Sequence, residues 1–220
     1  MTSPPALSRE QVREYDRRVI QGGIPGITLM LNAAKGATDI LLSKSPNGPI
    51  FILCGKGNNG GDGFVIARLL TEKNIPVIVE MLSDAEQITG DAKLAFNQMC
   101  DAGITARRFD FTDDSRFKNA EWVVDAMLGT GTQGEIRSPF REAIEMVNRS
   151  QRPVFAIDIP SGLDCDTGEP LGPTIVAKMT ATFVALKLGF LNPNSQRFTG
   201  EVSVVDIGGG PFQQILADRL

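Results

Sequence analysis

The sequence contains no histidine, and this absence removes several catalytic designs. Without imidazole there is no Ser-His-Asp triad, no Cys-His pair and no histidine-ligated metal. Any acid or base must therefore be a carboxylate, a lysine, a tyrosine or a cysteine. Cysteine is also scarce, because Cys54, Cys100 and Cys165 are far apart and form no CxxC pair. Their spacing argues against a disulfide framework and against a zinc site.

An excess of basic residues and a long apolar run are missing as well. Lys and Arg total 22 against 26 Asp and Glu, and the pI is about 5.0, so no overall positive field attracts nucleic acid or an anionic membrane. No apolar run approaches the roughly 20 residues of a membrane span. The opening residues Met1-Thr2-Ser3-Pro4-Pro5 lack the basic and apolar regions of a secretory leader. We therefore expect a cytoplasmic protein whose partner is a small molecule, with no nucleic acid and no membrane.

The patterns that are present alternate strands with helices. At 220 residues and 42% hydrophobic content, with no repeat or linker, the chain predicts one domain with a full core. The alternation is typical of an α/β fold whose parallel sheet is covered on both faces. Residues 83–103 are helical either from a Ser83–Glu86 cap or only after an irregular segment up to Thr89, and 110–119 form a loop or short helix. The remaining pattern predicts helices at 8–21, 27–41, from 63 onward, from 138 onward and at 212–216, and strands at 49–54, 76–81, 122–126, 153–158, 179–185 and 201–207.

A glycine-rich stretch follows the first of these strands and leads into a helix. It reads Gly57-Asn58-Asn59-Gly60-Gly61-Asp62-Gly63. Glycine permits positive φ and close approach of the backbone to a ligand, and the first N–H groups of a helix bind anions. A tight turn without a ligand is the structural alternative, but it needs no asparagine or aspartate. We therefore predict a phosphate site and expect Gly61→Val to weaken substrate binding.

Two later strands end in a similar way. Asp125 is followed by the loop Gly129–Glu135, and Asp158 is followed by Pro160-Ser161-Gly162. Ligands of parallel α/β sheets lie outside the carboxyl ends of the strands, so these loops and the first glycine stretch predict one cleft. A single acidic residue at a strand end can simply cap a helix. Two of them beside glycine-rich loops favour a functional site.

A dinucleotide-binding motif is the competing interpretation. Gly129, Gly131 and Gly134 match G-x-G-x-x-G, with Asp158 near the position of a ribose-binding acid. In that motif the helix opens within the glycines, whereas Pro139 and its neighbours intervene here. The match is weak, and no Walker pattern is present. An NAD-dependent dehydrogenase remains an alternative on this motif alone.

Taken together, these motifs resemble the YjeF N-terminal domain, the family of NAD(P)H-hydrate epimerases. The resemblance implies a Rossmann-like three-layer α/β/α sandwich with a mostly parallel central sheet, spanning residues 1–220 as one domain and forming a homodimer. It implies an isomerase that interconverts the R and S forms of hydrated NADH and NADPH, which carry a hydroxyl at nicotinamide C6. A separate dehydratase is then the partner, because no such domain is attached. The motifs are Gly57–Gly63, Val124–Ala126 with Gly129–Gly131, Ala156–Asp164, and Gly200–Val202 with Val205–Gly208.

The resemblance also assigns site residues. It implies K⁺ ligands at Asn59, Asp125 and Ser161, and their oxygens are hard donors suited to a hard cation. Asp158 contacts the substrate, and we predict it as the catalytic acid–base residue, with partial burial raising its pKa. Lys187 aligns with a family lysine near the site, but we expect a solvated lysine at a strand end. The implied substrate-binding residues are Asn58, Asn59, Gly60, Gly61, Asp62, Gly129, Thr130, Gly131, Thr132, Gln133, Gly134, Glu135 and Asp158.

The chain departs from the family pattern at two places. Leu31 stands where the family has Glu, and Gln133-Gly134-Glu135 replaces an Arg-Pro pair. Because some relatives of this domain serve without the epimerase role, a non-catalytic scaffold or binding module of the same fold is an alternative. The acidic pI and the presence of Asn59, Asp125, Asp158 and Ser161 argue against it.

Overall fold

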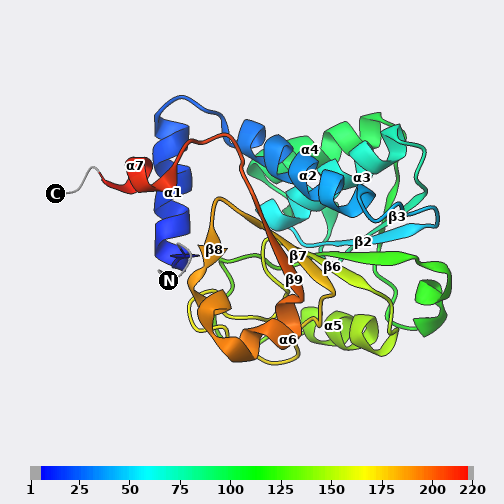
Figure 1. Ribbon diagram of the computed structural model, residues 1–220. Coiled ribbons are helices and arrows are strands. Elements are labelled where there is room, and N and C mark those ends of the chain that lie inside the picture. Colours follow the sequence, from blue (N-terminus) through cyan, green and yellow to red (C-terminus); the bar gives the residue numbers. More distant parts are fainter. Residues whose placement is uncertain (1–5, 218–220) are drawn as a thin grey trace.

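The computed structural model describes residues 6–217, so the opening pentapeptide considered above lies outside the described residues. Its centre is a seven-stranded parallel sheet in the order β4-β3-β2-β5-β6-β7-β9 (Figure 1). The predicted α/β fold with a mostly parallel sheet is confirmed. The strands are β2 (Ile50–Cys54), β3 (Val77–Met81), β4 (Ala106–Arg108), β5 (Trp122–Ala126), β6 (Val154–Ile157), β7 (Met179–Phe183) and β9 (Glu201–Val205), and β1 (Ala6–Leu7) pairs separately with β8 (Leu186–Lys187).

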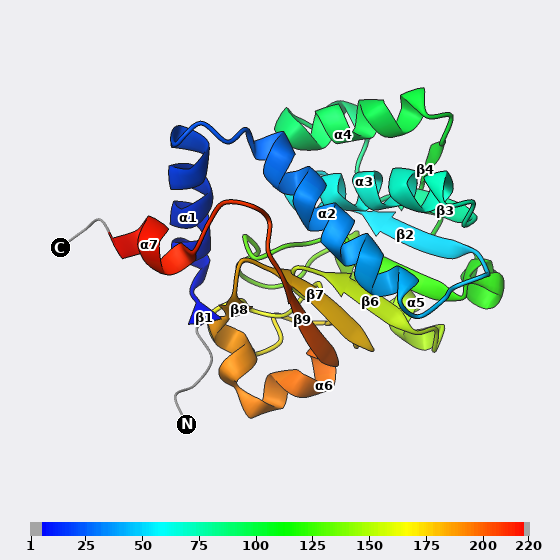
Figure 2. The ribbon, with the colours of Figure 1, turned by 45° about the horizontal axis from the view of Figure 1, so that its top comes forward.

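Strand β2 explains why the sheet carries helices on both faces. All five of its side chains are buried, and successive side chains point to opposite faces. Ile50, Ile52 and Cys54 join one core cluster, whereas Phe51 and Leu53 join the other. In Figures 1 and 2, α2, α3 and α4 cover one face, and α5 and α6 lie on the other. Their bounds are α2 (Gly26–Leu42), α3 (Asn58–Glu72), α4 (Gly90–Asp101), α5 (Phe140–Arg149) and α6 (Gln196–Thr199).

Helix α1 (Arg9–Gln21) stands apart from these layers, beside α7 (Phe212–Ala217) (Figures 1 and 2). A capping box begins α1, because the side chains of Ser8 and Gln11 each bond to the other's backbone N–H. The Tyr15 hydroxyl donates to the Gly210 carbonyl at 2.9 Å, and Arg18 donates to the Ile215 carbonyl at 2.6 Å. The segment after β9 therefore holds α1 in place.

Several element boundaries differ from the predicted ones. A 3₁₀ turn over Ala85–Gln87 precedes α4, so the irregular alternative for this segment is the right one. Strand β4 was missed because its two arginines are exposed at the sheet edge and give it no apolar run. The polar segment 110–119 ends in a 3₁₀ turn. The helix predicted from 138 onward begins at Phe140, directly after Pro139.

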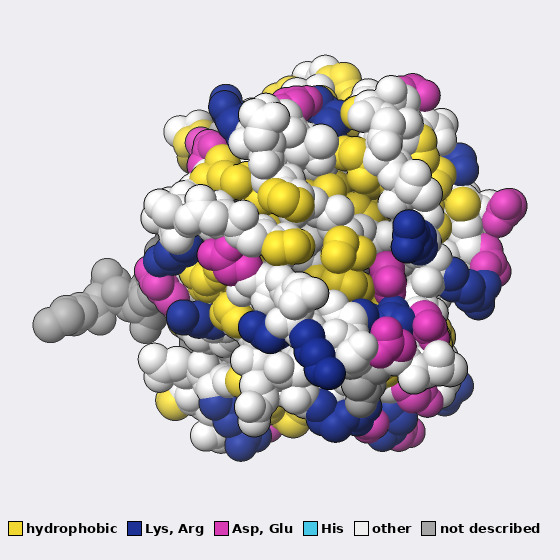
Figure 3. Space-filling model, turned by 90° about the vertical axis from the view of Figure 1, so that its right-hand side faces the viewer, with side chains coloured by type: hydrophobic (Ala, Val, Ile, Leu, Met, Phe, Trp, Pro, Cys, Tyr) yellow, Lys and Arg dark blue, Asp and Glu magenta, His cyan; other side chains and the backbone are white. Residues whose placement is uncertain are grey.

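The face at the right of Figure 1 shows side chains of both charge signs interspersed around apolar ones (Figure 3). No continuous basic surface is visible on this face, in keeping with the formal net charge of −4. Among residues 6–217, no helix combines the length and the apolarity that crossing a lipid bilayer requires.

Candidate active site

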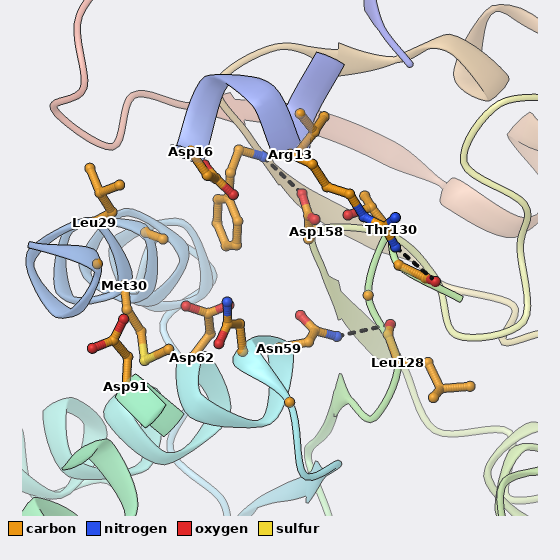
Figure 4. A pocket seen from close by; sticks show the side chains of 18 of the residues that line it. Arg13, Asp16, Leu29, Met30, Asn59, Asp62, Asp91, Leu128, Thr130 and Asp158 are labelled. Carbon is orange, nitrogen blue, oxygen red and sulfur yellow. Dashed lines mark hydrogen bonds between the residues drawn. The ribbon is translucent and has the colours of Figure 1, made fainter. Parts of the chain in front are cut away.

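A pocket of about 640 Å³ lies at the carboxyl ends of the central strands, with α1 and α2 forming its other walls (Figure 4). This is the place predicted for a ligand in an open parallel sheet. Gln133, Gly134 and Glu135 line a neighbouring pocket of about 490 Å³, while Gly60 and Gly61 line neither. The predicted residues that line the main pocket are Asn58, Asn59, Asp62, Gly129, Thr130, Gly131, Thr132 and Asp158.

The glycines after β2 have a different role from the predicted one. Helix α3 already begins at Asn58, and Gly60, Gly61 and Gly63 are helical, without positive φ. A Cβ on Gly60 would lie 1.9 Å from the Gly55 carbonyl oxygen, and one on Gly61 would lie 2.6 Å from Met30 Cε. These glycines therefore let α3 pack tightly against its neighbours. Packing brings the N-terminus of α3, with its free N–H groups, to the pocket as an anion site.

Gly57 and Gly61 are expected to respond differently to substitution. Gly57 lines the pocket, a Cβ there would meet nothing within 4 Å, and its extended backbone suits valine. Gly57→Val is expected to keep the fold and raise the substrate concentration needed for half-maximal turnover. Gly61→Val is expected to lower the free energy of unfolding by about 1–3 kcal/mol through overpacking. Urea unfolding and substrate titration of both variants measure this, and an unchanged KM for Gly57→Val would place the phosphates elsewhere.

The three residues that resemble potassium ligands lie together around Leu128. Ser161 donates its Oγ–H to Asp125 Oδ1 at 2.6 Å and its backbone N–H to Asp125 Oδ2 at 2.7 Å. Leu128 N–H donates to Ser161 Oγ at 2.9 Å, and Asn59 Nδ2 donates to the Leu128 carbonyl at 2.9 Å. Complete burial raises the pKa of Asp125 to about 6, and the bonds from Ser161 oppose this rise. The carboxyl ends of β5 and β6 and the start of α3 thus converge on one cluster of oxygens.

One atom of this cluster, Asn59 Oδ1, is an argument for a cation site. Asn59 Oδ1 is buried and, among the described residues, accepts no hydrogen bond. Leaving such an oxygen unsatisfied costs about 1–3 kcal/mol, which a bound cation offsets. No group of three His, Cys, Asp or Glu side chains in residues 6–217 is arranged to hold a metal. The amide, carboxylate and hydroxyl donors therefore fit a hard cation better than a transition metal.

Lys187 corrects the expectation of a solvated side chain. It is fully buried, its Nζ lies 2.7 Å from Asp158 Oδ1, and it donates to the Phe183 carbonyl at 2.9 Å. The reason is tertiary, because the pairing of β8 with β1 folds the lysine inward beneath the pocket. A buried ammonium needs a counter-charge, and Asp158 supplies it.

The backbone beside this ion pair is strained. Asp158 has φ of 65° and Val184 has φ of 69°, both in the left-handed region. This conformation is unfavourable for any residue with a Cβ and most of all for a β-branched one. Both residues line the pocket. Strain of this kind gathers at functional sites, so it supports the assignment of the pocket.

The structure adds carboxylates that the sequence did not assign to a catalytic role. Asp16 of α1 lines the pocket, and burial, followed by the charge of Asp158, raises its pKa to about 6. Burial and the charges of Asp158 and Asp16 raise the pKa of Asp62 well above its usual range. In Figure 4, Asp16, Asp62 and Asp158 extend toward the same space from three different elements. Asp16 reaches the pocket only because α1 docks beside it. The residues around Asp16 in the sequence do not indicate that its carboxylate faces this pocket.

The fold and the pocket define a doubly wound α/β protein with a helix N-terminus and several carboxyl groups lining one pocket at the carboxyl edge of its sheet. The chain belongs to the family described as "YjeF-related protein N-terminus", whose sequence model matches residues 26–189. The matched segment contains α3, Lys187 and the cluster of oxygens formed by Asn59, Asp125 and Ser161 around Leu128.

Named relatives cover nearly the whole chain. It is 39% identical to the "NAD(P)H-hydrate epimerase" of Rhodopirellula baltica over 93% of this chain and 84% of that protein. It is 38% identical to the protein of the same name from Pirellula staleyi over 89% of this chain and 92% of that protein. The "Bifunctional NAD(P)H-hydrate repair enzyme Nnr" of Coxiella burnetii is 37% identical, and the match covers 90% of this chain but 40% of that longer protein.

A solved structure has the same fold. The crystal structure of yeast ynu0 superposes with a TM-score of 0.79 at 22% identity, covering 91% of this chain and 87% of that one. The dinucleotide-binding motif, in contrast, does not have the expected geometry. Helix α5 begins only at Phe140, so the glycines from 129 to 134 do not open a helix. The observed geometry therefore does not support the dehydrogenase alternative.

Proposed function

We propose that this protein is an NAD(P)H-hydrate epimerase, an isomerase that interconverts the R and S forms of hydrated NADH and NADPH, with residues 1–220 forming one domain. The observation that carries the proposal is the Asp158–Lys187 ion pair, strained and buried beside Asp62 in one pocket. It lies in a chain whose relatives bear this name over almost their full length.

We position the substrate in the pocket from the groups that can bind its phosphates. The N-terminus of α3 and the loop after β5 offer N–H groups, and the positively charged Arg13 and Lys56 line the same pocket. The loop after β5 runs from the main pocket to its neighbour, which share Leu128, Thr132 and Phe140. We therefore place the dinucleotide along this loop, with Gln133, Gly134 and Glu135 at one end and the nicotinamide beside Asp158.

Epimerisation at C6 breaks and remakes one carbon–oxygen bond. The hydroxyl leaves with the bonding electrons once it is protonated, and the ring nitrogen lone pair stabilises the resulting cation. Water then adds to the opposite face of C6 and loses a proton. The reaction needs one proton donor and one proton acceptor, each worth typically about 10²–10⁴-fold in rate.

Two carboxyl groups meet this need in different states. Asp158 is paired with the Lys187 ammonium, and a carboxylate in this ion pair can accept the proton from the water that adds. Asp62 has no cationic partner among the described residues, and the rise in its pKa favours the protonated form, which can donate to the departing hydroxyl. Asp158 therefore remains the proposed catalytic residue, acting as a base, while Asp62 is the proposed acid. Each half of the reaction uses one of them, and the reverse reaction exchanges their roles.

Potassium is proposed at the cluster around Leu128, held by Asn59, Asp125 and Ser161. The orphaned Asn59 Oδ1 and the hard oxygen donors support this assignment. When bound, the ion supplies a fixed positive charge beside the phosphate-binding loops. The residues themselves fix the Leu128 backbone and thereby the start of the loop after β5.

Asp125→Ala is expected to weaken potassium binding and activity, since it removes the only formal charge among the three donors. The expected result is that KCl, compared with choline chloride, raises the melting temperature and the rate of the parent but changes neither in Asp125→Ala. Asp39→Ala, at an exposed position of α2, is the matched control for loss of a carboxylate. A potassium titration that is identical for Asp125→Ala and the parent would contradict the assignment.

A separate NAD(P)H-hydrate dehydratase is the proposed partner in the pathway, and a homodimer is the proposed assembly. The direct test of function starts from one separated epimer of hydrated NADH and follows the appearance of the other. A dehydrogenase changes the absorbance of NADH because it oxidises the cofactor, whereas an epimerase leaves the redox state and hence this absorbance unchanged. A folded protein that accelerates neither change favours the scaffold alternative. Sedimentation of the purified chain measures its assembly.

A further inference from the structure

Arg9, the first residue of α1, joins three segments that lie far apart in the sequence. Its side chain is buried, with only 7% of the residue exposed. Its Nε donates to the Thr130 carbonyl at 2.7 Å, and its Nη2 donates to Asp164 Oδ2 at 2.7 Å. Asp166 completes the arrangement, because Oδ1 accepts from the Arg9 backbone N–H at 2.7 Å and Oδ2 lies 3.3 Å from Nη1.

The two carboxylates hold the guanidinium in one position. Asp164 Oδ1 accepts from the backbone N–H groups of Asp166 at 3.0 Å and Thr167 at 2.8 Å, so this anchor is itself fixed. These bonds, together with Arg9, lower the pKa of Asp164 against the effect of burial. The charge of Arg9 is therefore already neutralised by the protein. Arg9 does not line the pocket, and its effect on a ligand must pass through Thr130.

The Thr130 carbonyl determines the direction of the next N–H group. In a trans peptide, the carbonyl of Thr130 and the N–H of Gly131 point in opposite directions. Arg9 draws this carbonyl toward α1, so the Gly131 N–H points away from α1. Within residues 6–217 no acceptor for that N–H is found, whereas the next N–H, of Thr132, donates to the Gly129 carbonyl at 3.2 Å. Gly131 lines the pocket, and one helical turn after Arg9 the side chain of Arg13 lies 3.5 Å from the Gly131 carbonyl.

We propose that Arg9 is a positioning residue that orients the Gly131 N–H to donate to a phosphate of the bound dinucleotide. The proposal rests on the proposed function, since the anion is the substrate's pyrophosphate. Arg9 precedes the segment 26–189 that matches the family, as do Arg13 and Asp16, the α1 residues that line the pocket.

The test compares Arg9→Gln and Arg9→Lys with the parent. Loss of a hydrogen bond to a charged group corresponds to about tenfold or more in affinity. Arg9→Gln is expected to raise KM for hydrated NADH about tenfold, with kcat nearly unchanged, and to raise the Kd for NADH by a similar factor in calorimetry. Arg9→Lys keeps the charge but not the planar fork, so an intermediate effect is expected. Arg17→Gln is the control, because Arg17 lies on the same helix, is exposed and pairs with Glu14.

Three outcomes decide the proposal. Unchanged KM and NADH affinity in folded Arg9→Gln overturn it, and so does a loss of kcat alone. If Arg9→Gln does not fold, Asp166→Asn loosens the same guanidinium while keeping Arg9, and an unchanged KM and NADH affinity in that variant overturn it as well. If the parent binds NADH but does not epimerise the hydrate, the proposed function fails. The positioning role then stands or falls by the NADH affinities of the variants.

Discussion

Asp158→Asn is expected to lower kcat by about 10²–10⁴-fold, the usual contribution of one acid–base group, with KM little changed. The amide keeps the size of the side chain and still accepts a hydrogen bond from Lys187, but it cannot take a proton from water. Steady-state rates on a separated epimer measure the loss. Asp91→Asn, a second carboxylate that lines the pocket, is the matched control.

The same experiment separates the two proposed carboxyl groups. Asp62→Asn is also expected to lose activity, because the departing hydroxyl then lacks its acid. A folded Asp158→Asn variant that epimerises at the parental rate would remove Asp158 from the mechanism. If Asp62→Asn is fully active and Asp158→Asn is inactive, Asp158 both donates the proton to the departing hydroxyl and accepts the proton from the added water.

Lys187→Met is expected to lower the free energy of unfolding by about 3 kcal/mol, the lower end of the range for breaking a buried ion pair, since it leaves the partly buried Asp158 carboxylate without its cationic partner. The Lys187 side chain is fully buried, and its Nζ lies 2.7 Å from Asp158 Oδ1. Activity should fall as well, because the ionised state of Asp158 loses its stabilising charge. Urea unfolding monitored by circular dichroism measures the first effect, with Lys35→Met on the exposed side of α2 as the control.

A double-mutant cycle tests the cause. Combining Asp158→Asn with Lys187→Met removes both charges, so the double variant is expected to be more stable than Lys187→Met alone while remaining inactive. A double variant no more stable than the single one would mean that the loss comes from packing and not from an unpaired charge.

The sheet was predictable from the sequence because β2 and its neighbours are short apolar runs that end at turns, and both faces of a parallel strand are buried. The convergence of Asn59, Asp125 and Ser161 was predictable for a related reason, since all three lie at or just after the carboxyl ends of strands. Strand β4 was not predictable, because an exposed edge strand with two arginines has no apolar pattern to reveal it.

The errors at the site share a different cause. Lys187 looks solvated in the sequence because lysine at a strand end normally is, and only the pairing of β8 with β1 turns it inward. The glycines of α3 looked like a flexible loop because glycine signals positive φ more often than it signals close packing, yet Gly60 lies against the Gly55 backbone. Asp16 and Arg9 contribute through contacts that span more than a hundred positions of the chain, and no local pattern records them.

The position of α1 also determines when the pocket is completed during folding. Tyr15 and Arg18 bond to carbonyls 195 and 197 residues further along the chain, whereas β2 pairs with β3 and β5, which follow it much more closely. Contacts of such long sequence separation carry the largest loop-closure entropy, so we expect them to form after the central strands have paired. In a partly folded chain whose central strands have paired but whose α1 has not docked, we therefore expect an incomplete pocket. The Thr130 carbonyl then lacks its hydrogen bond from Arg9, and Asp16 does not line the pocket. We therefore expect the chain to bind substrate only after the long-range contacts of α1 have formed.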